Sequence, residues 1–234
     1  NSILNASNVT KIETWNVRTM FQTGRMAQAI REFERFQLEI LALSEVRWTG
    51  SGKISSVNER IITARLQSRH AKTTIVSVYA PTEDANDEEK DTFYQQCQDV
   101  LNSIPSHDIV LFAGDMNAQI GNNRAGLEHV IVPHGSKTWR SPDDKIENEI
   151  DYICISKIWR SVLTDVRVCR GADVGSDHHL VQGKVQLKLK KMQKPKPIRP
   201  FAVKKLKQQK SQQFRLALEI KFEPLLQATD IEEQ

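Results

Sequence analysis

The sequence predicts a mixed α/β fold, α+β in type, in which two β-sheets pack on each other and helices lie outside them. Apolar and β-branched runs with the length of strands recur along residues 11–190, whereas only two long segments within that range have the spacing of an amphipathic helix. Two of the runs, 38–46 and 109–113, are almost entirely apolar, as expected for strands buried on both faces. Many strands with few helices are most easily covered when sheet packs against sheet.

The predicted strands follow one another along most of the chain. They are expected at residues 11–17, 38–46, 60–66, 73–79, 109–113, 150–156, 162–169 and 180–189. A polar turn at 67–71 predicts that the third and fourth strands form a hairpin. Residues 118–147 are polar, and we expect a loop there with one further strand at 130–132.

Two helices are predicted between these strands. The first covers residues 24–36, where Met26, Ala29, Ile30 and Phe33 recur at helical spacing. The second follows the acidic segment 81–89, whose negative charges suit the positive end of a helix dipole.

Charge separates the chain into a body and a tail. Residues 178–218 hold twelve Lys and Arg and no Asp or Glu, although the whole chain carries a net charge of only +4. Such a basic segment favours binding to a polyanion such as nucleic acid. The alternative is a solvated tail without a binding role. We expect an N-terminal segment at 1–10, one domain at 11–190, and a basic linker with a short helix at 191–234.

The sequence also limits the expected cellular location of the protein. No stretch approaches the ~18 apolar residues of a membrane span, and no secretory signal is recognised. The three cysteines lie in apolar periodic segments without metal-ligand spacing, which is typical of core residues in a reducing compartment. We therefore expect an intracellular protein without a membrane partner.

Polar side chains stand at or just beyond the ends of five predicted strands. An apolar strand that ends in an acid, an amide or an imidazole is costly to build unless those ends converge on a metal or a phosphate. The five stretches are Thr14-Trp15-Asn16-Val17, Leu43-Ser44-Glu45, Gly114-Asp115-Met116-Asn117, Ile150-Asp151-Tyr152 and Ser176-Asp177-His178.

The first three stretches are suited to a metal and an attacking water. Mg²⁺ prefers one or two carboxylates together with water and phosphate oxygens, and Glu45 is well placed to supply one. Asn16 interrupts a strand where Asn is disfavoured, which indicates a polar task. Asp115 is suited to polarising a water, and Asn117 to donating to a phosphate. A purely structural interpretation is also open for these stretches. Gly-Asp-X-Asn would then form a turn that ends a strand, and Glu45 would be a solvent-facing residue at a strand end.

The last two stretches are suited to holding a cationic imidazole. Asp177 lies beside His178 in the sequence, and a carboxylate that holds an imidazole keeps it charged near neutral pH. Asp151 lies in an otherwise apolar strand, where a lone buried acid is costly, so we expect it to pair with His178.

With these residues in place, the chain resembles the endonuclease/exonuclease/phosphatase superfamily, which has a DNase I-like fold. The likeness runs from about residue 11 to about residue 189 and is strongest to the apurinic-type endonuclease domain of RTE (BovB) non-LTR retrotransposons. The motifs that carry it are TWNVRTM, LALSEVRWTGSG, YAPT, GDMNAQIG, IDYICIS and GSDHHLV. Residues 201–222 resemble the connector that such elements place before a reverse transcriptase.

The resemblance implies a role for each matching residue. Tyr79, Asp115, Asn117, Asp151 and His178 would be catalytic, with the identity of the general base left open and Asp115 as our choice. Thr138 and Ser176 would be hydroxyls on the phosphate side. The metal, Mg²⁺ with Mn²⁺ as the alternative, would lie among Asn16, Glu45, Asp115, Asn117, Asp177 and His178.

The same resemblance implies a DNA substrate and a nuclear location. Its members cut one DNA strand and leave a 3′-hydroxyl, and no oligomer is implied. Two departures bear on activity, because only 33 residues separate Glu45 from Tyr79 and again Asn117 from Asp151, fewer than in relatives. We expect two internal deletions that weaken activity. Arg18 stands where abasic-site repair relatives carry a metal-side acid, which argues against a repair specialist.

Three other interpretations of the sequence are open. An inactive remnant that binds nucleic acid through residues 184–210 is the main alternative. A phosphodiesterase for inositol phosphate or sphingomyelin fits the basic tail less well. The Asp-His-His triplet at 177–179 is also typical of DHH phosphoesterases, but their upstream acidic motifs are not found.

Overall fold

Two four-stranded sheets form the body of the protein. The computed structural model describes residues 4, 8–47, 57–68, 70–120, 137–188, 212–213 and 215–221. Within these residues, the first sheet has the order β2-β1-β10-β9 and the second the order β3-β4-β5-β8. The strands of the first sheet are β1 (Thr10–Asn16), β2 (Ile40–Ser44), β9 (Leu163–Cys169) and β10 (Leu180–Val185). Those of the second are β3 (Ile61–Gln67), β4 (Lys72–Tyr79), β5 (Ile109–Asp115) and β8 (Asp151–Ile155).

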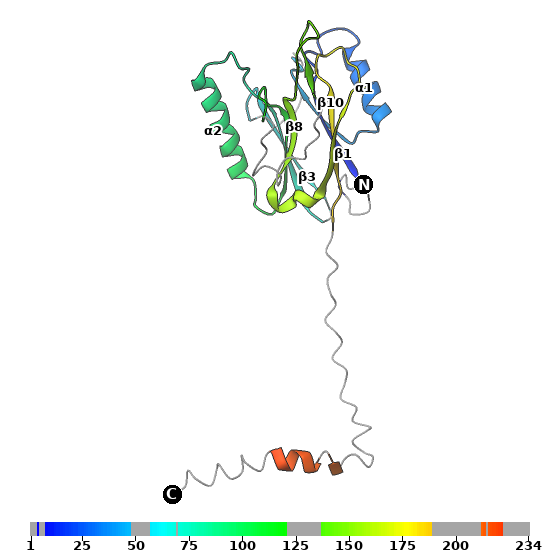
Figure 1. The fold of residues 1–234 in the computed structure, drawn as a ribbon, viewed down its shortest axis with the longest axis vertical. Coiled ribbons are helices and arrows are strands. Elements are labelled where there is room, and N and C mark those ends of the chain that lie inside the picture. Colours follow the sequence, from blue (N-terminus) through cyan, green and yellow to red (C-terminus); the bar gives the residue numbers. More distant parts are fainter. Residues whose placement is uncertain are drawn as a thin grey trace. The chain divides into compact units, whose positions relative to one another are not determined.

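The sheets pack face to face with one helix on each outer side. The core between them includes Ile12 of the first sheet with Leu111 and Ile153 of the second, all almost fully buried. Helix α1 (Arg25–Phe36) covers the outer face of the first sheet, and α2 (Asp87–Ser103) covers the outer face of the second. Figure 1 shows the two helices on opposite sides of the strands. The predicted α/β fold with two packed sheets is confirmed.

Strand direction brings the polar strand ends to one end of the sandwich. β1 pairs with β2 in parallel, and β4 pairs with β5 in parallel, so these four strands finish in pairs at their carboxyl ends. β10 runs antiparallel to β1, and β8 runs antiparallel to β5, so the starts of these two strands lie beside those ends. The register places Asp115 directly opposite both Tyr79 and Asp151.

The predicted hairpin is confirmed, since β3 and β4 pair antiparallel over seven residue pairs from Ile61↔Val78 to Gln67↔Lys72. Two predictions need correction. Of the apolar face expected on α1, Ala29 is buried, whereas Met26 and Ile30 are 42% and 51% exposed. A small side chain at Ala29 allows close contact with the sheet, and the helix meets the sheet along a narrower stripe than the pattern predicts.

The second correction concerns the expected loop at 118–147. Here β6 (Trp139–Arg140) pairs antiparallel with β7 (Glu147–Asn148), which begins at the last residue of the expected loop. Strands of two residues are too short for a sequence pattern to reveal. A 3₁₀ helix at Lys157–Val162 was also not predicted. The strand expected at 130–132 lies outside the described residues.

Residues 190–234 form a second compact unit. Its described residues, 212–213 and 215–221, are helical and their side chains are exposed. Among all described residues, no helix is both long and apolar enough to cross a membrane.

Candidate active site

Asn16, the last residue of β1, joins two acids from different sheets. Its Nδ2 donates to Glu45 Oε1 at 2.9 Å and to Asp115 Oδ2 at 2.9 Å. The Asn16 side chain is buried, and its Oδ1 accepts from the Arg18 amide at 2.9 Å, which fixes the orientation of the amide group. One buried amide therefore links the end of β1 to the end of β5 and to the residue that follows β2.

His178 lies between two buried carboxylates just before β10. Its Nδ1 is 3.0 Å from Asp151 Oδ2, and its Nε2 is 3.8 Å from Asp115 Oδ2. The side chain of His178 is 7% exposed, and those of Asp115 and Asp151 are 1% exposed. Trp15 Nε1 donates to the His178 carbonyl at 3.0 Å, so both sheets hold the histidine in place.

Burial and neighbouring charges shift both titrating groups at this contact. Burial, and after it the charge of Asp151, raises the pKa of Asp115 to about 6 against the opposing effect of His178. Burial alone would lower the pKa of His178, but the hydrogen bond to Asp151 and the nearby acids outweigh it and raise that pKa. Near neutral pH the site therefore favours an ionised Asp115 beside an imidazolium, the protonation states that base and phosphate contact require.

Tyr79 ends β4 on the other side of Asp115. Burial, and then the charge of Glu45, raises the pKa of Tyr79 to about 12, so the phenol stays protonated and acts as a donor. The Arg60 guanidinium lies over its ring at 5.5 Å, and Arg60 also pairs with Glu89 of α2 at 2.7 Å. The tyrosine is thus held between the end of β5 and α2.

The backbone around the cluster is strained. Glu45 and Asn117 have φ values of 53° and 46°, a left-handed region that is uncommon for residues other than glycine. The Asn117 amide N–H donates to Asp115 Oδ1 at 2.9 Å, and its Nδ2 donates to the Ala80 carbonyl at 2.7 Å. These bonds pin Asn117 next to the carboxylate that precedes it by two residues.

The donor set fits a hard divalent cation. Ligand atoms of Asp115, Asp151 and His178 all lie within 4.8 Å of one another, and Glu45 shares the amide of Asn16 with Asp115. Asp151 Oδ1 is buried, and no hydrogen-bond partner for it lies among the described residues. The two buried acids, Asp115 and Asp151, against one imidazole leave excess buried negative charge, which a cation bound by oxygen ligands would neutralise.

The structure brings together most of the predicted site. Asn16, Glu45, Tyr79, Asp115, Asn117, Asp151 and His178 meet at one end of the sandwich. Asp177 has other partners, since its Oδ2 contacts Arg18 at 3.4 Å and Trp139 Nε1 at 3.3 Å. Its role as a metal ligand stays a prediction.

The two predicted hydroxyls have backbone partners. Thr138 is fully buried, and its Oγ1 accepts from the amides of Ile150 and Asp151 at 3.0 and 3.1 Å, which sets the start of β8. Ser176 Oγ donates to the Asn16 carbonyl at 2.7 Å and accepts from the His178 amide at 3.2 Å. Both hydroxyls position catalytic candidates, and a direct phosphate contact stays a prediction for each.

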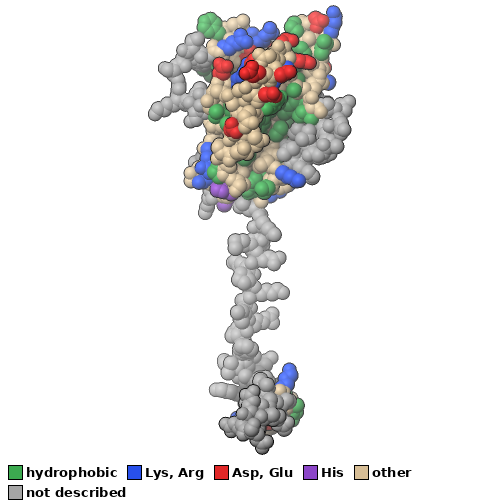
Figure 2. Space-filling view, turned by 90° about the vertical axis from the view of Figure 1, so that its left-hand side faces the viewer, with side chains coloured by type: hydrophobic (Ala, Val, Ile, Leu, Met, Phe, Trp, Pro, Cys, Tyr) green, Lys and Arg blue, Asp and Glu red, His purple; other side chains and the backbone are tan. Residues whose placement is uncertain are grey.

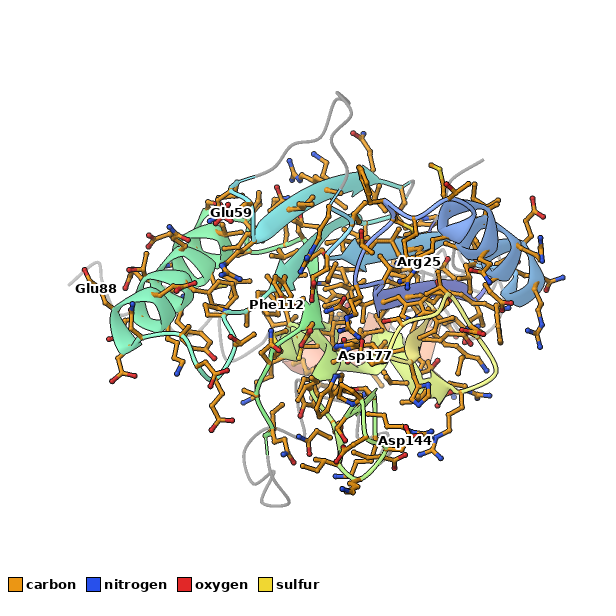
Figure 3. The ribbon with its side chains drawn as sticks, turned by 90° about the horizontal axis from the view of Figure 1, so that it is seen from above. Arg25, Glu59, Glu88, Phe112, Asp144 and Asp177 are labelled. Atoms are coloured by element: carbon orange, nitrogen blue, oxygen red, sulfur yellow. The ribbon has the colours of Figure 1, made fainter. Side chains whose placement is uncertain are left out.

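Sequence reasoning missed three side chains at this end. Arg47 pairs with Glu45 Oε2 at 2.8 Å, Arg60 stacks on Tyr79, and Trp139 contacts Asp177. Arg47 lies two residues after the candidate ligand Glu45, so its place near the site could have been inferred from the sequence. Arg60 and Trp139 depend on contacts across the fold that no local pattern reveals. Figure 3 looks onto this end, with Asp177 near the middle and Glu59 and Glu88 on the α2 side.

Solved structures confirm the class of fold. The endonuclease domain of TRAS1, a telomere-specific non-LTR retrotransposon, superposes with a TM-score of 0.59 at 15% identity, over 77% of this chain and 99% of that one. An AP endonuclease from Archaeoglobus fulgidus gives 0.60 at 15% identity, over 76% and 100%. The 3′ phosphatase NExo from Neisseria, bound to a product DNA hairpin, gives 0.59 at 17%, over 76% and 100%.

The chain therefore has the fold of endonuclease/exonuclease/phosphatase proteins. No model of a known protein family matches it. In sequence it is similar to craniofacial development protein 2 of Bos taurus, 31% identical over 82% of this chain and 43% of that protein. The protein of the same name from Tragulus javanicus is 30% identical over 81% of this chain and 44% of its own length. The chain thus spans less than half the length of these curated relatives.

Proposed function

We propose that this domain is a Mg²⁺-dependent DNA endonuclease of retrotransposon origin that nicks one strand and leaves a 3′-hydroxyl. One observation carries the proposal: a buried Asn16–Asp115 bond and an Asp115–His178–Asp151 contact bring an amide, acids and an imidazole into one cluster. The resemblance of its motifs to RTE endonucleases and the TRAS1 structure support DNA as the substrate. Mn²⁺ is the alternative metal, and a nuclear location goes with the substrate.

Each residue then has a defined task. A divalent cation at this site would neutralise charge on the phosphate, and Glu45, Asn16 and the carboxylates of Asp115 and Asp151 are the groups that would hold it. Asp115, with its pKa near 6, is ionised at neutral pH and accepts a proton from the attacking water.

On the phosphate side, the imidazolium of His178 and the amide of Asn117 donate to the non-bridging oxygens. Tyr79 contributes a neutral hydroxyl, and Asp151 keeps His178 protonated and oriented. The strained backbone at Glu45 and the hydrogen bonds of Asn117 fix these side chains before substrate arrives.

Nicking of supercoiled plasmid tests the proposal. We expect conversion to the open circle with Mg²⁺, none with EDTA, and a loss of at least ~100-fold for Asp115→Asn and for His178→Ala. Asp99→Asn and His107→Ala are matched controls, because Asp99 is exposed on α2 and His107 is 72% exposed. Nicking by Asp115→Asn/His178→Ala at the wild-type rate would remove the proposal. End-labelling of the nick with a polymerase checks the 3′-hydroxyl.

A second candidate is a nucleic-acid-binding remnant without activity. The dense basic charge at residues 184–210 and the short spacing between site motifs favour it. It predicts that DNA binding survives Asp115→Asn and falls steeply with salt while no variant or wild type nicks.

A further inference from the structure

Two arginines stand at the rim of the candidate site, each shortly after the end of a strand of the first sheet. Arg18 follows the end of β1 and Arg47 follows the end of β2, and the loops that carry them are joined by hydrogen bonds from Val17 N to Ser44 O and from Met20 N to Val46 O. The parallel pairing of β1 with β2 therefore places both arginines at the same edge of the first sheet.

Both arginines have a backbone conformation that costs energy. Their φ values are 57° and 50°, in the left-handed region that few residues other than glycine adopt. Such strain at two positions next to a site indicates that the direction of the side chain matters there.

Each arginine faces a carboxylate of the site and remains largely in solvent. Arg18 Nη1 is 3.4 Å from Asp177 Oδ2, and Arg47 Nη2 is 2.8 Å from Glu45 Oε2. The arginine side chains are 57% and 67% exposed, so these pairs are hydrated and contribute little stability. An incoming anion can therefore replace the carboxylate at small cost.

The charges around this end of the domain favour an anion on the arginine side. Figure 2 looks onto the α2 side and shows Asp and Glu side chains gathered on the upper part of that face. The first turn of α2 alone carries Asp87, Glu88 and Glu89. In Figure 3, Glu59 and Glu88 lie on the α2 side, whereas Arg25 lies toward α1. The acidic first turn of α2 disfavours a DNA backbone on that side.

We propose that Arg18 and Arg47 bind backbone phosphates of the DNA strand that enters the site, and release Asp177 and Glu45 as they do so. A guanidinium presents a planar fork of donors that matches a phosphate in two hydrogen bonds, which a lysine does not. The inference rests on the proposed function for its substrate class, but it concerns binding and needs no chemical step.

DNA binding without metal tests the inference directly. A fluorescent duplex is titrated with the full chain in EDTA, and anisotropy is measured across a range of salt concentrations. We expect Arg18→Ala and Arg47→Ala each to weaken binding roughly three- to tenfold, and each to reduce the slope of log affinity against log salt by about one. Arg18→Lys and Arg47→Lys should recover the salt slope but only part of the affinity.

Arg167→Ala is the matched control. Arg167 is 55% exposed and pairs with Asp165 on β9, so its removal breaks an equivalent exposed ion pair away from the site. Thermal melts of all variants exclude loss of folding. The inference would be overturned if the double variant Arg18→Ala/Arg47→Ala bound DNA with the affinity and salt slope of the wild type. It would also be overturned if Arg167→Ala lost as much DNA affinity as the rim variants. Plasmid nicking with Mg²⁺ separates the two proposals, since a wild type that binds through these arginines but never nicks contradicts the endonuclease alone.

Discussion

Asn16 and Asp115 lie 99 residues apart in the chain and share a buried hydrogen bond of 2.9 Å that joins the two sheets at the candidate site. Because the same Nδ2 also donates to Glu45, one amide holds two carboxylates that would otherwise repel each other. This arrangement makes Asn16 the residue on which the geometry of the acids depends.

Replacement of Asn16 by Ala should reduce nicking by about 100-fold, because both carboxylates lose the donor that positions them. The free energy of unfolding of the variant should also fall by about 1–3 kcal/mol, because Glu45 and Asp115 lose the hydrogen bonds that Asn16 donates. Plasmid nicking and urea unfolding measure the two effects. Asn102→Ala, an exposed amide on α2, is the control. Wild-type nicking by Asn16→Ala would contradict this view of the site.

Asp115→Asn should stabilise the metal-free protein at alkaline pH. The folded pKa of Asp115, about 6, lies above its ordinary value of 3.8, so the folded state holds the extra proton between these values. Stability from this group is present at low pH and is lost as pH rises through 6. We expect the variant to melt several degrees above wild type at pH 8 in EDTA, with a smaller difference at pH 5. A larger difference at pH 5 would reverse the sign and refute the assignment.

Asp151→Asn should lower the pKa of His178, because it removes the hydrogen bond and charge that outweigh burial. A smaller fraction of the imidazole would then be protonated at pH 7, so the nicking rate at pH 7 should fall and should recover in part at lower pH. NMR titration of the His178 ring checks the shift. An unchanged midpoint would show that Asp151 does not control this histidine.

Gly114→Ala should destabilise the domain strongly. Gly114 has φ 148°, and an added Cβ would lie 1.9 Å from the Val78 carbonyl oxygen, so β4 and β5 would have to separate. We expect a loss of at least ~3 kcal/mol in urea unfolding, more than backbone strain alone would cost. Gly24→Ala is the control, because its φ of 92° is also left-handed but no atom lies within 4 Å of its added Cβ. Equal losses in the two variants would assign the effect to strain rather than to the clash.

Glu13→Gln should stabilise the protein without changing nicking. Glu13 is fully buried in β1 opposite Gln182 of β10, away from the site, and burial raises its pKa to about 8 from an ordinary 4.5. Its stabilising proton is lost as pH rises through 8, and wild-type stability falls between these values by at most about 1.4 kcal/mol per pH unit. Urea unfolding at pH 5 and pH 9 should show a gap between variant and wild type that widens with pH. A constant gap would contradict the raised pKa.

The strands of the fold were predictable because apolar runs reveal buried strands directly. The hairpin of β3 and β4 followed from the polar turn at 67–71. Polar side chains at strand ends pointed to Asn16, Glu45, Asp115 and His178, whereas Tyr79 was implied by the resemblance alone. β6 and β7 were not predictable, since two-residue strands carry no periodicity.

Partnerships across the fold were the other limit of sequence reasoning. Asp151 was expected to pair with His178, and it does, because a lone acid in an apolar strand requires a partner. The contacts of Asp177 with Arg18 and Trp139 could not be read from the sequence, where the neighbour of Asp177 is His178. Which partner an acid takes depends on tertiary geometry.

The pairing of β10 with β1 delays folding of the first sheet during synthesis of the chain. The last strand of the domain lies between β1 and β9, and the residues that precede it include His178. A nascent chain therefore cannot assemble the first sheet until about residue 185 has left the ribosome. We expect a premature stop codon upstream of β10 to yield an unfolded chain and not a weakened enzyme. A partial copy of the gene that ends before β10 would then produce no folded protein.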